Sequence, residues 1–174
     1  TTTKHRVAVL GGGSFGTALA NIIADNGHDI VLWLRNVERA QEINEHHVNS
    51  EYLPDFSLNP ALRAETDLAA AIASCDIVFM AVPSSSCRDV AREVARHIKP
   101  DAILISTTKG IEANGFRLMS QVLREEIPQV RLGVMSGPNL AKEIAAKQLT
   151  ATVIASADDD LNATVQDLLH CGYF

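Results

Sequence analysis

A short apolar segment runs directly into a glycine-rich turn near the start of the chain. Residues 7–10 (VAVL) are followed by Gly11, Gly13 and Gly16, and an apolar helix is predicted to begin inside this turn. In such a pattern the first glycine makes the tight turn, the second lets the backbone approach a pyrophosphate, and the third lets the helix pack on the preceding strand. The free N–H groups at the helix start can then face an anion. The turn indicates dinucleotide binding, while a merely flexible connection between strand and helix is the alternative for the glycines taken alone.

Short apolar segments alternate with amphipathic segments along the rest of the chain. Strands are predicted over residues 7–10, 30–34, 62–64, 76–82, 102–106, 130–135 and 150–156. Helices are predicted over residues 14–26, 37–47, 67–73, 84–99, 114–126, 139–147 and 158–170. This alternation is typical of a doubly wound α/β fold, a mainly parallel Rossmann-like sheet with helices on both faces. Ligands of such sheets bind beyond the carboxyl ends of the strands, so we expect the functional residues in the strand-to-helix turns.

Composition narrows the class of protein. The 174 residues are 47% hydrophobic and 21% charged, which suits one domain with a substantial core. The net charge of −6 argues against a nucleic-acid partner, because phosphate backbones are met by clustered lysines and arginines. The three cysteines and the histidines have no metal-ligand spacing, so we predict reduced thiols and no metal site. No apolar run approaches the roughly 20 residues of a membrane span and no signal peptide is recognisable, which favours a cytoplasmic location.

The end of the second predicted strand bears on the choice of cofactor. A dinucleotide with a plain ribose usually meets a carboxylate about 20 residues past the glycines, but this position holds Arg35. A guanidinium cannot accept the ribose hydroxyls, whereas it can pair with a 2′-phosphate and stack on adenine. The sequence therefore favours NADP, or at least tolerance of it, over strict use of NAD. A solvated surface cation is the alternative interpretation of Arg35.

Two later turns carry groups that suit an anionic ligand. Lys109 follows a buried strand, where an ammonium group can hold a substrate phosphate or polarise a carbonyl while hydride arrives. Gly137 and Asn139 lie in a turn that opens another helix and that could form a second anion site. The alternatives are a surface lysine in the first turn and an ordinary capped helix start in the second.

Four segments in this order resemble the bacterial NAD(P)-dependent glycerol-3-phosphate dehydrogenases. They are GGGSFGTALA (residues 11–20), LWLR (32–35), TKGIE (108–112) and SGPNLAKE (136–143). The resemblance covers the whole chain and implies hydride transfer between NAD(P)H and dihydroxyacetone phosphate, which gives sn-glycerol 3-phosphate for phospholipid synthesis. A phosphorylated small molecule is then the expected substrate, and NADP or NAD the cofactor.

The resemblance also implies roles for individual residues. The positions assigned to the cofactor, together with the fingerprint glycines, are Gly11, Gly13, Ser14, Phe15, Gly16, Arg35, Lys109 and Ala141. The positions assigned to the substrate are Lys109, Gly137 and Asn139. Phe15 stands where many relatives have tryptophan, and Asn139 stands where many have serine or threonine.

The family's proton-transferring lysine and most of its substrate pocket belong to a later, helical domain. Residues 173–174 look like the first residues of another strand. We therefore expect residues 1–174 to be the NAD(P)-binding domain alone, with the C-terminal helical substrate domain absent, little activity by itself, and a homodimer as one assembly open to the full-length protein. The alternatives are a reductase of the 3-hydroxyacid or ketopantoate type, whose members generally lack the TKG and SGP turns, and a dinucleotide-sensing module.

Overall fold

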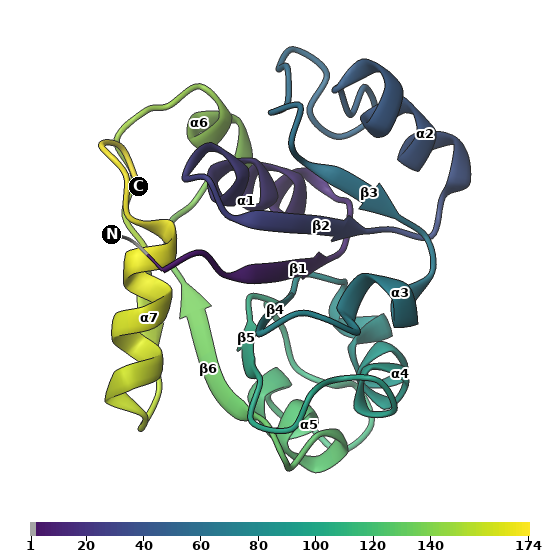
Figure 1. Cartoon of the computed structure of the whole chain (residues 1–174). Coiled ribbons are helices and arrows are strands. Elements are labelled where there is room, and N and C mark those ends of the chain that lie inside the picture. The colour runs from purple at the N-terminus through teal and green to yellow at the C-terminus, as the bar shows by residue number, and fades with distance from the viewer. Residues whose placement is uncertain (1–2) are drawn as a thin grey trace.

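The computed structural model describes residues 3–174, whose strands form one seven-stranded sheet (Figure 1). The strands are β1 (Arg6–Leu10), β2 (Asp29–Trp33), β3 (Arg63–Glu65), β4 (Ile77–Met80), β5 (Ile103–Ser106), β6 (Arg131–Ser136) and β7 (Val153–Ala155). The helices are α1 (Ser14–Asp25), α2 (Val37–His46), α3 (Leu68–Ile72), α4 (Ser84–Ala95), α5 (Met119–Glu126), α6 (Ala141–Ala145) and α7 (Asp159–Leu169).

The strand order is β3-β2-β1-β4-β5-β6-β7, and every neighbouring pair except the last is parallel. The chain winds outward in one direction from β1 to β3 and then crosses back to β4 beside β1. This arrangement confirms the predicted doubly wound α/β fold. The junction of β1 and β4 is the point where the direction of winding reverses, and ligands of this fold class bind there.

The edge strand β7 runs antiparallel to β6, with Ser136 paired to Val153. Helix α6 has five residues and spans only about 8 Å, whereas β6 has six residues and is about 20 Å long. The chain does not return to the amino end of the sheet after α6, and β7 starts where β6 ends.

Helices cover both faces of the sheet (Figure 1). Strand β1 lies in the middle and is buried on both faces: Val7 and Val9 belong to the apolar cluster under α1 and α7, and Ala8 and Leu10 belong to the cluster under α3, α4 and α5. A strand buried on both faces needs a continuous apolar run, which is what residues 7–10 supply.

Two local predictions were wrong. Helix α5 begins at Met119 rather than at residue 114, because Gly115 and Phe116 both have positive φ angles, which end a right-handed helix. Residues 107–118, named here the Lys109 loop, are consequently irregular. Residues 173–174 form no strand. They close a turn in which the Tyr173 carbonyl accepts a hydrogen bond from the Thr150 N–H at 2.9 Å.

Candidate functional site

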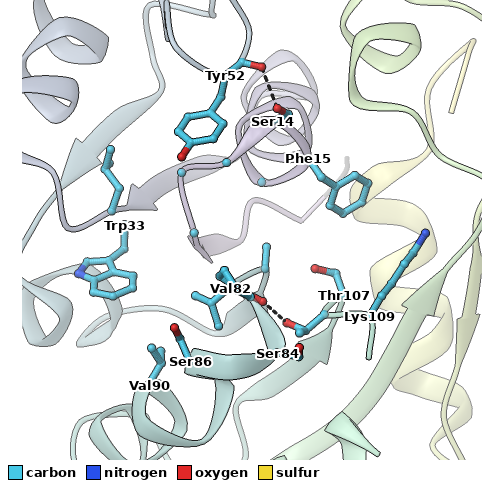
Figure 2. A pocket seen from close by; sticks show the side chains of 18 of the residues that line it. Ser14, Phe15, Trp33, Tyr52, Val82, Ser84, Ser86, Val90, Thr107 and Lys109 are labelled. Atoms are coloured by element: carbon cyan, nitrogen blue, oxygen red, sulfur yellow. Dashed lines mark hydrogen bonds between the residues drawn. The ribbon is translucent and has the colours of Figure 1, made fainter. Parts of the chain in front are cut away.

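A cleft of about 660 Å³ lies beyond the carboxyl ends of the central strands (Figure 2). The glycine turn after β1 and the residues that follow β2, β4, β5 and β6 line it. Among the residues singled out from the sequence, the cleft is lined by Gly11, Gly13, Ser14, Phe15, Gly16, Arg35, Lys109, Gly137 and Asn139. Ala141 lies outside this lining as the first residue of α6, where it packs partly against the core.

The three fingerprint glycines meet three different demands of the turn. Gly11 has a φ of +125°, and an added Cβ would lie 2.3 Å from the Ala81 carbonyl oxygen on the neighbouring strand end. A Cβ on Gly16 would lie 2.0 Å from the Gly11 oxygen, so this glycine is required for α1 to pack on the turn. A Cβ on Gly13 would meet no atom within 4 Å, because this position opens toward the cleft. The turn therefore has two glycines enforced by packing and one that faces open space.

The amino end of α1 faces the cleft with its N–H groups uncapped by a side chain. Gly13 is the N-cap, and the first turn of the helix contains no acidic residue. Ser14 follows, but its hydroxyl donates to the Tyr52 carbonyl at 2.8 Å, as Figure 2 shows, rather than capping the helix. The positive end of the α1 dipole is thus available to an anion of the size of a phosphate group.

One end of the cleft is rich in arginine and aromatic side chains. Arg35 follows β2, and its guanidinium carbon lies 5.8 Å from the centre of the Trp33 ring. Arg39 lies four residues later in the first turn of α2, stacks over Tyr52 at 4.6 Å and forms an ion pair with Glu51. Arg39 and Tyr52 also line the cleft, although neither was predicted from the sequence. The position of Arg39 in the first turn of the helix that follows the second strand was the available signal, whereas no local pattern indicated Tyr52.

The opposite end of the cleft brings together the turns after β5 and β6. The Lys109 ammonium group donates to the Gly137 carbonyl at 3.3 Å. Figure 2 shows Phe15 on the same side of the cleft as Lys109, and Trp33 and Tyr52 on the other. The Asn139 side-chain oxygen accepts from the Thr150 hydroxyl at 3.0 Å, so its amide nitrogen is the group left to donate.

The turn that carries Lys109 is fixed against the end of β4. The Thr108 hydroxyl lies 2.8 Å from the Val82 carbonyl oxygen. Gly110 has a φ of +128°, and a Cβ there would press on Ser84 at 3.0 Å. These contacts fix the turn that carries the lysine against the residues that follow β4.

Residues 3–174 contain neither a cluster of metal-binding side chains nor a helix able to span a membrane. No group of three or more His, Cys, Asp or Glu side chains is arranged to hold a metal ion in that range. Cys75 and Cys87 are buried and unpaired, and burial raises the pKa of each thiol to about 11. Within the same residues, no helix has the length and apolar character to cross a membrane.

Comparison with known proteins identifies the family. The family model described as NAD-dependent glycerol-3-phosphate dehydrogenase N-terminus matches residues 6–162. The glycerol-3-phosphate dehydrogenase [NAD(P)+] of Teredinibacter turnerae is 53% identical over 167 residues, which are 96% of this chain and 49% of that protein. The enzyme of the same name from Acinetobacter baumannii is 51% identical over 99% of this chain and 48% of its own length.

The same family appears among solved structures. Glycerol-3-phosphate dehydrogenase from Coxiella burnetii superimposes with a TM-score of 0.93 at 34% identity, over 98% of this chain and 52% of that one. The chain therefore spans about half the length of the curated relatives it matches. These matches favour the predicted family over a 3-hydroxyacid or ketopantoate reductase. The chain belongs to the family of NAD-dependent glycerol-3-phosphate dehydrogenase N-terminal domains.

Proposed function

We propose that this chain is the cofactor domain of a glycerol-3-phosphate dehydrogenase and binds NADP or NAD in the cleft of Figure 2. The observation that carries the proposal is the uncapped amino end of α1, which opens into the cleft behind Gly13 at the β1 to β4 junction. The reaction is hydride transfer between NAD(P)H and dihydroxyacetone phosphate to give sn-glycerol 3-phosphate, a precursor of phospholipids.

The two ends of the cleft suggest how the dinucleotide lies. Its pyrophosphate would meet the glycine turn and Ser14, and its adenosine end would extend toward Arg35 and Trp33. Its nicotinamide end would lie near Phe15 and Lys109. We also assign Ala141 to the nicotinamide side, where a shift of the short helix α6 would be needed to bring it to the cleft.

Lys109 would act on the substrate as well as on the cofactor. Its ammonium group carries three donors, and the Gly137 carbonyl takes one of them. The others can hold the substrate phosphate or polarise the carbonyl that accepts hydride. Gly137 and Asn139 would complete this side through the backbone and the amide donor of Asn139.

The share of each relative that this chain covers determines which steps of the reaction we assign to it. Half of each curated relative has no counterpart in these 174 residues. We assign proton transfer by a lysine and most of the substrate pocket to a helical domain in that half. The 174 residues alone should then bind the cofactor but reduce dihydroxyacetone phosphate very slowly, and substantial steady-state turnover by this chain would contradict this division.

We also propose the partners, the location and the assembly of the protein. Its acidic charge and the absence of a clustered basic motif in the sequence support a protein without a nucleic-acid partner. We propose a cytoplasmic location for it. A homodimer is the assembly we propose for the longer protein.

The proposal is tested by titrating the chain with NADPH and with NADH, followed by nicotinamide fluorescence. Arg35→Ala should weaken NADPH binding about tenfold and NADH binding less than about twofold, because the 2′-phosphate loses one charge-assisted partner. Arg124→Ala is the matched control, since this arginine is exposed on α5 and lies outside the cleft lining. Equal binding of both cofactors by the parent and by Arg35→Ala would make Arg35 a surface residue, and no binding of either cofactor by the parent would contradict the proposed function.

A further inference from the structure

The loop between α2 and β3 supplies a buried polar contact to the glycine turn. This segment, residues 47–62, is named here the Asn49 loop. Asn49 is polar and lies outside the helices and strands, yet 0% of its surface is exposed. Its side-chain nitrogen donates to the Gly12 carbonyl at 3.1 Å and to the Thr17 hydroxyl at 2.9 Å. Its side-chain oxygen lies 3.4 Å from the Tyr52 N–H. Both donors of the amide are therefore used, and one of them holds the backbone of the turn.

The Gly12 carbonyl belongs to the same planar peptide unit as the Gly13 N–H. In a trans peptide these two groups point in opposite directions, so an interaction that fixes one also aims the other. Asn49 holds the carbonyl on the side of the Asn49 loop. The Gly13 N–H must then point away from that loop.

The Gly13 N–H has no hydrogen-bond partner among residues 3–174. The peptide lies between two glycines, which are the residues with the widest choice of backbone angles, so the turn alone does not fix its orientation. Side chains of the Asn49 loop supply the constraint that the glycines lack.

A second contact ties the same loop to the start of α1. The Ser14 hydroxyl donates to the Tyr52 carbonyl at 2.8 Å (Figure 2). The loop itself is anchored in the apolar core through Leu53, Leu58 and Leu62, which are all at most 4% exposed. The glycine turn is thus held in its orientation by a loop that is itself packed into the core.

We propose that Asn49 is a positioning residue of the cofactor site. By holding the Gly12 carbonyl it presets the Gly12–Gly13 peptide so that the Gly13 N–H is presented to the pyrophosphate before the cofactor arrives. The proposal rests on the proposed function, since it concerns the same cleft. A donor that is already oriented costs less to order on binding, so Asn49 raises affinity without touching the ligand.

A second asparagine that bridges two segments, Asn44, provides a control, although it is exposed whereas Asn49 is buried. Asn44 in α2 donates to the Ala64 carbonyl at 3.0 Å and accepts from the Ala64 N–H at 2.8 Å, so it joins two segments much as Asn49 does. Asn44 contacts β3 and lies outside the lining of the cleft. Loss of either amide should lower stability, but only the loss of Asn49 should affect the glycine turn.

The experiment compares the parent with Asn49→Ala, Asn49→Asp and Asn44→Ala. For each protein, thermal unfolding reports stability, and titrations with NADH and with ADP report affinity for ligands that contain a pyrophosphate. Asn49→Asp keeps the size of the side chain but replaces the donor with oxygens that repel the Gly12 carbonyl.

We expect both Asn49 variants to bind NADH and ADP about tenfold more weakly than the parent, at temperatures where each is folded. Asn44→Ala should bind them within about twofold of the parent, whatever its effect on the melting temperature. Affinity within twofold of the parent for the Asn49 variants, or an equal loss for Asn44→Ala, would overturn the inference while leaving the proposed function intact. A parent that bound neither NADH nor NADPH would instead overturn the proposed function, and this inference with it.

Discussion

The Asn49 loop and the Lys109 loop lie at the same cleft but are held by different forces. The Asn49 loop buries Leu53, Leu58 and Leu62 in the core and reaches the glycine turn through a fully buried amide. The Lys109 loop exposes its large apolar side chains: Ile111 is 56%, Phe116 83% and Leu118 54% exposed. One loop is thus part of the core, whereas the other lies on the surface.

Ion pairs take the place of burial at the Lys109 loop. Arg88 of α4 pairs with Glu112 of the loop and with Glu125 and Glu126 of α5. The arginine lowers the pKa of Glu112 and of Glu126, chiefly through hydrogen bonds to their carboxylates. Partly exposed ion pairs weaken with salt and with acid, whereas buried amides and apolar contacts change little. The side of the cleft proposed for the pyrophosphate is therefore held by the core, whereas the Lys109 side, proposed for the nicotinamide end and the substrate, is held by adjustable contacts.

The strongest test of a rigid glycine side is Gly16→Ala. The new Cβ would lie 2.0 Å from the Gly11 carbonyl oxygen, which belongs to a turn that cannot yield without moving β1. We expect a loss of roughly 3 kcal/mol or more in the free energy of unfolding, measured by denaturant titration. Gly172→Ala is the control, because a Cβ there meets no atom within 4 Å. A Gly16→Ala protein as stable as the control would show that the turn is soft, which would remove the contrast between the two loops.

Gly13→Ala separates binding from stability on the same turn. This Cβ meets nothing within 4 Å, and its backbone angles are open to alanine, so the free energy of unfolding should fall by no more than about 1 kcal/mol, the usual cost of alanine at an N-cap. The methyl group would occupy space beside the proposed pyrophosphate. Titration with NADH should show an affinity at least about tenfold lower than the parent's. Unchanged affinity would mean that the pyrophosphate does not approach this glycine.

The glycine turn was predictable because its constraints are local. Gly11, Gly13 and Gly16 are spaced as the turn requires, and the continuous apolar runs identified the buried strands. The start of α5 was not predictable from helical spacing, because the left-handed conformations of Gly115 and Phe116 leave no periodic signal. Asn49 escaped notice for a different reason: its partner Gly12 is 37 positions away, and only the folded core brings the two together.

Arg88→Gln tests the other side of the comparison. The substitution removes the charge and the forked donors that join the Lys109 loop to α4, so the loop should open more often. We expect amide hydrogen exchange over residues 107–118 to become roughly fivefold faster, while exchange over residues 47–62 stays unchanged. Arg96→Gln is the control, since Arg96 makes an exposed ion pair with Glu93 that does not touch the loop. Equal acceleration in both loops would mean that the ion pairs support the whole domain rather than this loop.

The smallest expected effect comes from Asp158→Asn, which tests whether ion pairs also stabilise α7, which packs on the opposite face of the sheet from α4 and α5. Asp158 caps α7 by accepting from the Leu161 N–H and pairs with Arg131 of β6 at 2.6 Å. The hydrogen bond from Arg131 lowers the pKa of this carboxyl group from 3.8 to about 2. A carboxyl whose pKa is lower in the folded state stabilises the fold above its unfolded pKa, and this contribution disappears as the pH falls from about 4 to about 2.

Asparagine caps a helix about as well as aspartate, so Asp158→Asn removes the charge and keeps the cap. The melting temperature at pH 7 should fall by roughly 2 °C, and the difference from the parent should shrink below pH 4 and vanish only well below pH 2, where Asp158 is protonated in the folded state as well. Asp159→Asn is the control, because Asp159 lies in the first turn of α7 and has no ion pair within residues 3–174. A difference that persisted well below pH 2 would assign the stabilisation to the cap rather than to the charge, and the ion pairs that hold a segment in place would then be limited to those of the Lys109 loop.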